Sequence, residues 1–247
     1  MSILTKIIIV NLITLIRIIG TFIVLIMSKT SSGVSIGIMT ILIYLSDVLD
    51  GVLARGFKVS TFFGALFDGA ADKLFTVVNF IVLYILIGDL ALIPLLIELL
   101  ICIVQFIKYK FNMNIKSNIV GKIKVWFLAF SIVLTFFATD ISNISFLTEE
   151  FINKVNSVDK NKLYLITLSP GIIMEFITLI SYIGEFFFKK NIEASMKKSS
   201  KVKRIKLTKD ERLNYAKNVW FSPEFYMKHK DETNLKDLRI EQKRMAK

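Results

Sequence analysis

Four aspartates lie in one short stretch of this sequence, between runs of residues that are almost entirely apolar. Asp47 and Asp50 are three residues apart, and Asp68 and Asp72 are four residues apart. On a helix each pair shares one face, because residues at these spacings are neighbours on the helix surface. Two carboxylate pairs that face each other across a short turn offer the oxygen ligands that divalent cations prefer. The spacing therefore predicts a cation site between two helices.

Small residues accompany the four aspartates along the same stretch. They would let two helices, or the phosphates of a ligand, approach the backbone closely. The alternative is that the aspartates lie in interfacial water and merely end the helices, but carboxylates within a membrane segment usually serve a function. The small residues are Gly51, Ala54, Gly64, Ala65, Gly69, Ala70 and Ala71.

The composition is that of a polytopic membrane protein. The chain has 247 residues, of which 54% are hydrophobic, and its mean hydropathy is +0.60. Several apolar runs reach the length of about 20 residues that crosses a bilayer. The only cysteine, Cys102, lies in such a run, and the only histidine, His229, lies near the C-terminus. These two facts exclude a disulfide framework and a His-rich or Cys-rich metal site, so any catalysis must rest on carboxylates, lysines, arginines and bound ions.

Hydropathy predicts an all-α fold, a bundle of about six transmembrane helices. The loops between the spans alternate between basic and mixed charge, and the basic loops mark the cytoplasmic side. We therefore expect a multi-pass protein of the cell membrane with both termini and the aspartate-rich turn in the cytoplasm. The six predicted spans run from 12 to 28, 34 to 54, 62 to 87, 90 to 107, 122 to 139 and 163 to 188.

The charge of the chain is concentrated in its C-terminal part. The formal net charge is +12, and residues 189–247 contain 18 basic and 8 acidic residues. This distribution divides the chain into a membrane domain, 1–188, and a basic cytoplasmic tail, 189–247, which is partly helical or disordered. The tail is expected to bind anionic membrane lipids rather than nucleic acid, and to take no part in the chemistry. The apolar patch Val219–Met227 could dock on the membrane domain or on the interface, and the sequence does not decide between them.

The aspartates also belong to a longer pattern. It reads Asp-x-x-Asp-Gly-x-x-Ala-Arg, then eight residues, then Gly-x-x-x-Asp-x-x-x-Asp. This pattern resembles the signature of the CDP-alcohol phosphatidyltransferases, and the resemblance covers about residues 8 to 188. Its fixed positions are Asp47, Asp50, Gly51, Ala54, Arg55, Gly64, Asp68 and Asp72.

The resemblance implies an enzyme that moves a phosphatidyl group from CDP-diacylglycerol to an alcohol and releases CMP. It implies Mg²⁺ or Mn²⁺ as cofactor, held by the aspartates, with Asp72 a further ligand or the catalytic base that accepts the proton of the acceptor hydroxyl. The predicted metal ligands are Asp47, Asp50, Asp68 and Asp72, and the residues predicted to bind the CDP-lipid are Asn11, Thr14, Arg17, Gly51, Ala54, Arg55 and Gly64.

Two shorter motifs concern the acceptor. Asn11-x-x-Thr14-x-x-Arg17 and the Gly-Lys-x-Lys sequence that begins at Gly121 are similar to segments of the phosphatidylglycerophosphate synthases. They favour glycerol 3-phosphate as acceptor, bound by a basic site made of Lys108, Lys122 and Lys124. These lysines would equally serve as positive-inside anchors, and serine or inositol phosphate stays open as an alternative acceptor.

A function of another class is a divalent-cation transporter whose carboxylates line a pathway across the bilayer. Glu98 and Glu175 lie deep in two spans, but packing with hydrogen bonds is the simpler role for them. The four aspartates lie near one face of the membrane, which favours an enzyme over a transporter. We also expect that the protein can form a homodimer.

Overall fold

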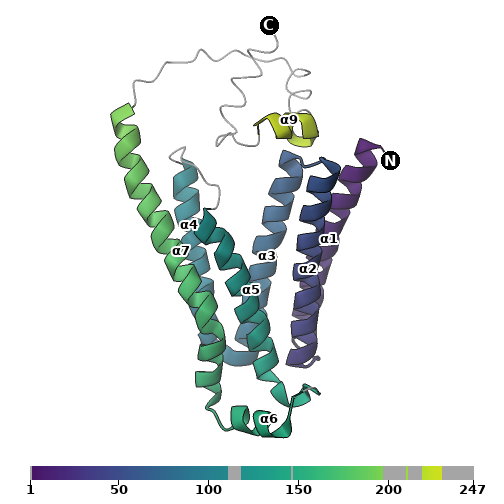
Figure 1. Cartoon of the computed structure of the whole chain (residues 1–247), viewed down its shortest axis with the longest axis vertical. Coiled ribbons are helices and arrows are strands. Elements are labelled where there is room, and N and C mark those ends of the chain that lie inside the picture. Colours follow the sequence, from purple (N-terminus) through teal and green to yellow (C-terminus); the bar gives the residue numbers. More distant parts are fainter. Residues whose placement is uncertain (1, 111–117, 146, 197–209, 211–218, 230–247) are drawn as a thin grey trace.

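The computed structural model is an all-helical bundle of long helices (Figure 1). The structure describes residues 2–110, 118–145, 147–196, 210 and 219–229, and within these it contains helices and no strand. The long helices are α1 (Ile3–Met27), α2 (Gly33–Phe57), α3 (Phe62–Ile87), α4 (Leu92–Lys110), α5 (Ile119–Thr139) and α7 (Lys160–Met196). The short ones are η1 (Gly88–Ala91), η2 (Ile141–Asn143), α6 (Glu149–Asn156) and α9 (Pro223–His229).

The long helices confirm the prediction of a polytopic membrane fold. Among the described residues, five helical segments are long and apolar enough to cross a membrane. The third of them, Phe62–Lys108, contains both α3 and α4, which η1 joins. Figure 1 shows α3 and α4 as separate long helices, with α4 beside α7, so the six predicted spans correspond to the six long helices.

Two of these helices extend beyond the predicted spans. α1 begins at Ile3, because the Ser2 side chain accepts a hydrogen bond from the Thr5 N–H at 3.1 Å and so caps the helix before the apolar run. α7 continues to Met196, past the predicted boundary at residue 188 between the two domains. That division of the chain stays a prediction.

A tight turn joins α2 to α3 and fixes how the two helices meet. Lys58 ends α2 in the left-handed conformation, with φ 54° and ψ 39°, which few residues other than glycine adopt. Three residues later Thr61 caps α3, accepting a hydrogen bond from the Gly64 N–H at 3.0 Å. The last turns of α2 and the first turns of α3 are therefore held close together at one end of the bundle.

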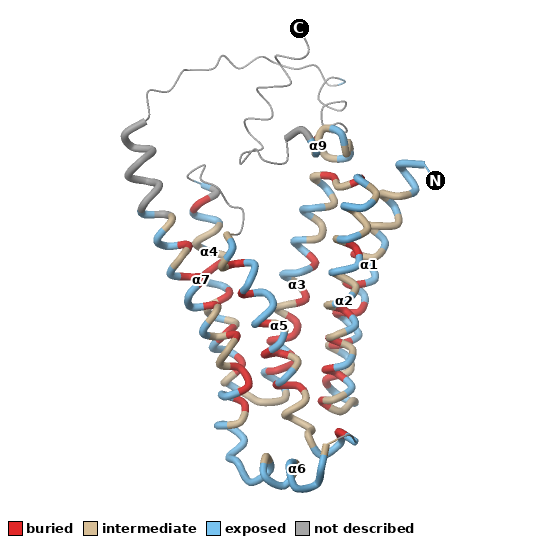
Figure 2. The backbone as a smooth tube through the Cα atoms, viewed as in Figure 1, coloured by how far each residue is buried: buried red, intermediate tan, exposed pale blue. Residues whose placement is uncertain are grey.

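Buried side chains hold the helices together, and apolar side chains also cover the outside. The core includes Val24, Ile36, Phe80, Ile132 and Phe136, which come from four helices. Many large apolar side chains are exposed instead, such as Leu4, Phe106 and Trp126, each more than 60% exposed. Figure 2 shows exposed residues along the outside of the long helices. A surface this apolar is stable in contact with lipid, so the exposed apolar side chains support the membrane location that the hydropathy of the sequence predicts.

The two ends of the bundle differ in what they carry. The α2–α3 turn, the N-terminus and α9 lie at one end, and η1 and α6 lie at the other (Figure 1). The first end is the one at which the sequence places the aspartate motif.

Candidate active site

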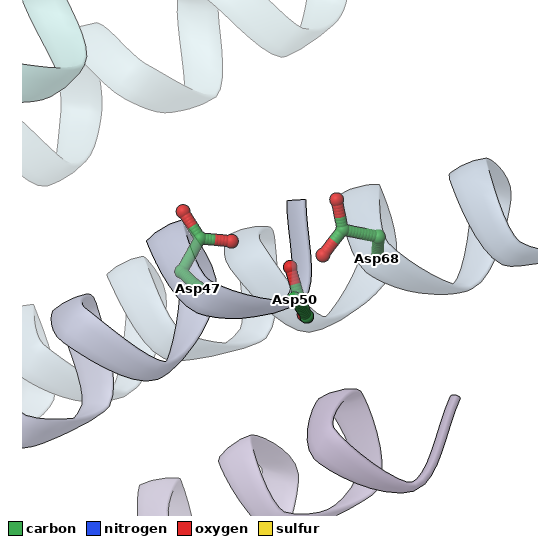
Figure 3. Close-up of side chains that lie close together, drawn as sticks. All are labelled: Asp47, Asp50 and Asp68. Atoms are coloured by element: carbon green, nitrogen blue, oxygen red, sulfur yellow. The ribbon is translucent and has the colours of Figure 1, made fainter. Parts of the chain in front are cut away.

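The carboxylates of Asp47, Asp50 and Asp68 lie close together at the junction of α2 and α3 (Figure 3). One oxygen from each lies within 4.8 Å of the others. Two oxygens bound to one divalent cation, each at about 2.0–2.6 Å, lie at most about 5 Å apart, so the spacing fits a shared ion. Three of the four predicted metal ligands thus form a group that could hold one.

Arg17 of α1 lies at the centre of all four aspartates. Its Nη2 is 2.7 Å from Asp47 Oδ1 and also contacts Asp50 Oδ2, and its Nη1 is 2.8 Å from Asp68 Oδ1 and 2.7 Å from Asp72 Oδ1. The arginine is only 1% exposed. It therefore brings the fourth aspartate, Asp72, into the same cluster.

The charge of this cluster still favours a bound cation. Four carboxylates and one guanidinium leave three negative charges at one end of the bundle when all are ionised. Each contact with Arg17 uses one oxygen of a carboxylate, which leaves the second oxygen of each for another cation. The residues present therefore fit a divalent ion by donor type, spacing and charge.

Arg17 is the member of the cluster whose position the sequence did not predict. The motif similarity placed it with the residues that bind the CDP-lipid, whereas in the structure its described contacts are to the aspartates. One sequence signal could have indicated this, because an arginine within an apolar span needs an acidic partner. The aspartate pattern, 30 residues further along the chain, was the available partner.

A pocket of about 250 Å³ opens beside the aspartates, between α1, α2 and α3. Asp50 and Asp68 lie in its wall. Six of the seven residues predicted to bind the CDP-lipid also line it, namely Asn11, Thr14, Gly51, Ala54, Arg55 and Gly64. Residues from three helices that the sequence could only group by motif therefore surround one cavity.

Local contacts fix the polar wall of this pocket. The Thr14 hydroxyl donates a hydrogen bond to Asp50 Oδ2 at 3.2 Å, and both residues are buried. A Cβ at Gly64 would lie 3.1 Å from Thr61 Oγ1 and 3.4 Å from Asn11 Oδ1, so glycine leaves room for these polar groups. The pocket therefore combines an immobilised carboxylate with an open backbone surface.

One residue of the pocket wall comes from the C-terminal part of the chain. Tyr226 of α9 lines the pocket together with the residues of α1, α2 and α3. The sequence left the docking of Val219–Met227 undecided and expected the tail to take no part in the chemistry. The structure docks this segment on the membrane domain, because Phe62 at the start of α3 packs against both Phe225 and Tyr226.

The three lysines predicted to bind the acceptor do not line this pocket. Lys124 is buried and forms an ion pair with Glu98, which also pairs with Lys73. Lys122 is exposed. Their role in acceptor binding stays a prediction.

Lys108 is buried as well and has two partners on α7. Its Nζ is 2.7 Å from Glu185 Oε2 and 4.8 Å from the ring centroid of Tyr182. Glu98 and Lys108 thus hold α4 to its neighbouring helices through ion pairs, in agreement with the packing role expected for Glu98.

The comparison with known families agrees with this site. The sequence matches the family CDP-alcohol phosphatidyltransferase over residues 7–155, more than half of the chain. The chain belongs to the CDP-alcohol phosphatidyltransferase family. No curated protein and no solved structure matches it.

Membership assigns the chain to transferases that move a phosphatidyl group from a CDP-alcohol to an alcohol acceptor. All four aspartates lie inside the part that matches the CDP-alcohol phosphatidyltransferase family, and so does every lining residue of the pocket except Tyr226. The match ends within α6, before α7 begins. This favours the enzyme over the cation transporter that the isolated carboxylates also allowed.

Proposed function

We propose that the protein transfers the phosphatidyl group of CDP-diacylglycerol to glycerol 3-phosphate and releases CMP, at the cytoplasmic face of the cell membrane. The observation that carries this proposal is the convergence of two residue sets on one place. Two aspartates of the family signature, Asp50 and Asp68, line a single pocket at one end of the bundle together with six residues predicted to bind the CDP-lipid, and Arg17 joins the other two aspartates to the same cluster.

The pocket suits the nucleotide part of the donor. Its volume of about 250 Å³ lies just below the roughly 300–1,000 Å³ of sites that enclose a drug-sized ligand, so it cannot hold a whole lipid. Its wall is polar near Asn11 and Thr14, and it carries the positive charge of Arg55, which suits a diphosphate. The acyl chains would then lie along the apolar outer faces of the helices, in the bilayer.

Divalent ions fit the carboxylate group beside this pocket, and Asp47, Asp50 and Asp68 would hold them. When bound, Mg²⁺ or Mn²⁺ would supply positive charge at the diphosphate and favour the departure of CMP. Arg17 of α1 fixes the position of the carboxylates, since it contacts one oxygen of each. The ions and the arginine thus share the charge of the four aspartates.

Asp72 is suited to the proton transfer. Its side chain is 50% exposed, whereas that of Asp50 is 4% exposed, so an incoming alcohol can approach it. The contact between Arg17 Nη1 and Asp72 Oδ1 holds the carboxylate in place and leaves Oδ2 to accept the proton of the acceptor hydroxyl. The alkoxide that results attacks the phosphorus of the donor, and CMP departs with the electrons of the broken bond.

For the acceptor phosphate, Lys122 is the first residue to test. Lys108 and Lys124 each pair with a glutamate, so they would have to share their charge between that glutamate and the acceptor. Lys122 lies on an exposed face of α5, two residues from Lys124, and the two point in different directions on the helix. This is in keeping with the expectation that only one of the pair touches the acceptor.

The test is CMP release by the purified protein in mixed micelles of CDP-diacylglycerol. Glycerol 3-phosphate, serine and inositol phosphate are offered in turn, each with Mg²⁺ and with Mn²⁺. We expect release with glycerol 3-phosphate, none in the Asp50→Asn variant, and a raised KM for glycerol 3-phosphate alone in Lys122→Gln. Release with serine but not with glycerol 3-phosphate would move the protein to another branch of the same family.

A further inference from the structure

The C-terminal helix α9 is held against the mouth of the pocket by aromatic contacts. The ring of Tyr226 meets that of Phe62 at a centroid distance of 5.0 Å and an interplanar angle of 71°, the edge-to-face geometry that aromatic pairs favour. Phe221 packs on Phe63 at 5.1 Å, and Val219 is 3% exposed. Figure 1 shows α9 lying across the end of the bundle where α2 meets α3.

The sequence around α9 fixes the direction of these side chains. Ser222 precedes the helix, and its hydroxyl accepts a hydrogen bond from the Phe225 N–H at 3.3 Å. Pro223 follows at the first helical position, where its missing N–H does no harm. With its start fixed in this way, α9 presents Tyr226 to the pocket and to Phe62 together.

Tyr226 and the aspartates lie at different levels of the pocket. Phe62, the contact of Tyr226, is the first residue of α3, and Asp68 follows six residues later. At a rise of about 1.5 Å per residue, the two levels are about 9 Å apart along the helix. That separation is comparable to the reach of a nucleoside from its 5′-phosphate to its base.

We propose that Tyr226 stacks on the pyrimidine base of the CDP-linked donor. The inference rests on the proposed function in one respect, namely that this pocket binds the nucleotide of the donor. With the diphosphate beside Asp50 and Asp68, the nucleoside extends toward the mouth of the pocket, where Tyr226 supplies a flat aromatic ring. Its edge-to-face contact with Phe62 holds that ring in one orientation before the donor arrives.

This contact makes α9 part of the donor site of this chain, although it lies outside the residues that match the family. Replacing an aromatic residue that stacks on a base by alanine weakens binding by about 5- to 150-fold. The loss of affinity should concern the donor and not the acceptor, because the nucleotide of the donor is bound before and during the transfer while the acceptor contacts other groups.

The experiment compares three variants of the full-length protein. Tyr226→Ala should raise KM for CDP-diacylglycerol by about 5- to 150-fold and weaken inhibition by CMP in the same proportion, with KM for the acceptor unchanged. Tyr226→Phe keeps the ring and should restore most of this loss. Phe221→Ala is the matched control, because it removes an aromatic contact with α3 made by a residue that lies just before α9 and does not line the pocket.

The outcomes separate this inference from the proposed function. If the wild type turns over and Tyr226→Ala keeps the donor KM, the stacking contact is refuted and the enzyme stands. Equal losses in Tyr226→Ala and Phe221→Ala would also refute it, because docking of α9 alone would explain both. Turnover with another acceptor leaves the donor test valid. A wild type that neither turns over nor is stabilised by CMP refutes the proposed function, and the inference with it.

Discussion

Replacement of Arg17 by glutamine tests whether the arginine is the structural counter-charge of the aspartate cluster. The substitution keeps a polar but shorter side chain and removes the positive charge that contacts all four carboxylates. When all four carboxylates are ionised, the net charge of the cluster then changes from −3 to −4. We expect a protein that is less stable and depends more strongly on divalent ions.

The size of the effect follows from the burial of each partner. Arg17 and Asp50 are both buried, with side-chain exposures of 1% and 4%, and breaking such a pair by removing one partner costs roughly 3–5 kcal/mol. The other three aspartates are more than a third exposed, so each of their pairs adds about 1 kcal/mol at most. The total loss is therefore roughly 3–8 kcal/mol, and at about 2–4 °C per kcal/mol for a chain of this size Tm should fall by roughly 6–32 °C.

Thermal unfolding in detergent, followed by tryptophan fluorescence, measures this change. Arg55→Gln is the matched control, since it removes the same charge from an exposed position in the wall of the same pocket and should alter stability by about 0.5 kcal/mol at most. Mg²⁺ should recover part of the stability lost in Arg17→Gln, and less in the double variant with Asp50→Asn. An Arg17→Gln protein that unfolds at the wild-type temperature, or no lower than Arg55→Gln, would contradict the reasoning.

Three further predictions concern the two buried glutamates, the close helix contact at Gly33, and Asp72. Glu98→Gln leaves two lysines without their ion-pair partner and should lower the free energy of unfolding by roughly 3–5 kcal/mol. Glu175→Gln should change the free energy of unfolding by about 1 kcal/mol at most, because no described residue hydrogen-bonds to either carboxylate oxygen of Glu175. Chemical denaturation measures the free energy of unfolding of both glutamate variants. Equal losses in Glu98→Gln and Glu175→Gln would contradict this pair of predictions. Gly33→Ala brings a Cβ to 2.5 Å from a backbone carbonyl of α5 and should lower the free energy of unfolding by about 1–3 kcal/mol, whereas Gly184→Ala, with nothing within 4 Å, should not lower it in the same measurement. Asp72→Asn should reduce kcat by roughly 10²- to 10⁴-fold and leave KM for CDP-diacylglycerol unchanged, and normal turnover would place the base elsewhere.

Much of the fold and of the candidate site could be predicted from the sequence, because both depend on the local pattern of residues. A span is a run of apolar residues about 20 long, so hydropathy located the long helices without knowledge of their packing. The aspartates of each helix share a face because of their spacing alone, and the turn between the helices is short. Hence the cluster of Asp47, Asp50 and Asp68 was predictable as a group before any tertiary contact was known.

The ends of α1 and α7 were less predictable than their centres. Hydropathy marks where the lipid begins, whereas a helix ends where its caps and backbone hydrogen bonds end. The hydropathy of the apolar run does not show that Ser2 caps α1. It also does not show that α7 continues as a helix to Met196.

Only the tertiary structure decided which distant groups meet. Arg17 lies 30 to 55 residues from the aspartates that it contacts, and Phe62 lies more than 160 residues from Tyr226. Helical periodicity says which face a side chain occupies, but not which helix packs against that face. The sequence therefore determined that this chain carries the carboxylates and the spans of a membrane transferase. The packing of α1 and α9 against α3 decided that an arginine holds those carboxylates together and that a tyrosine completes the pocket beside them.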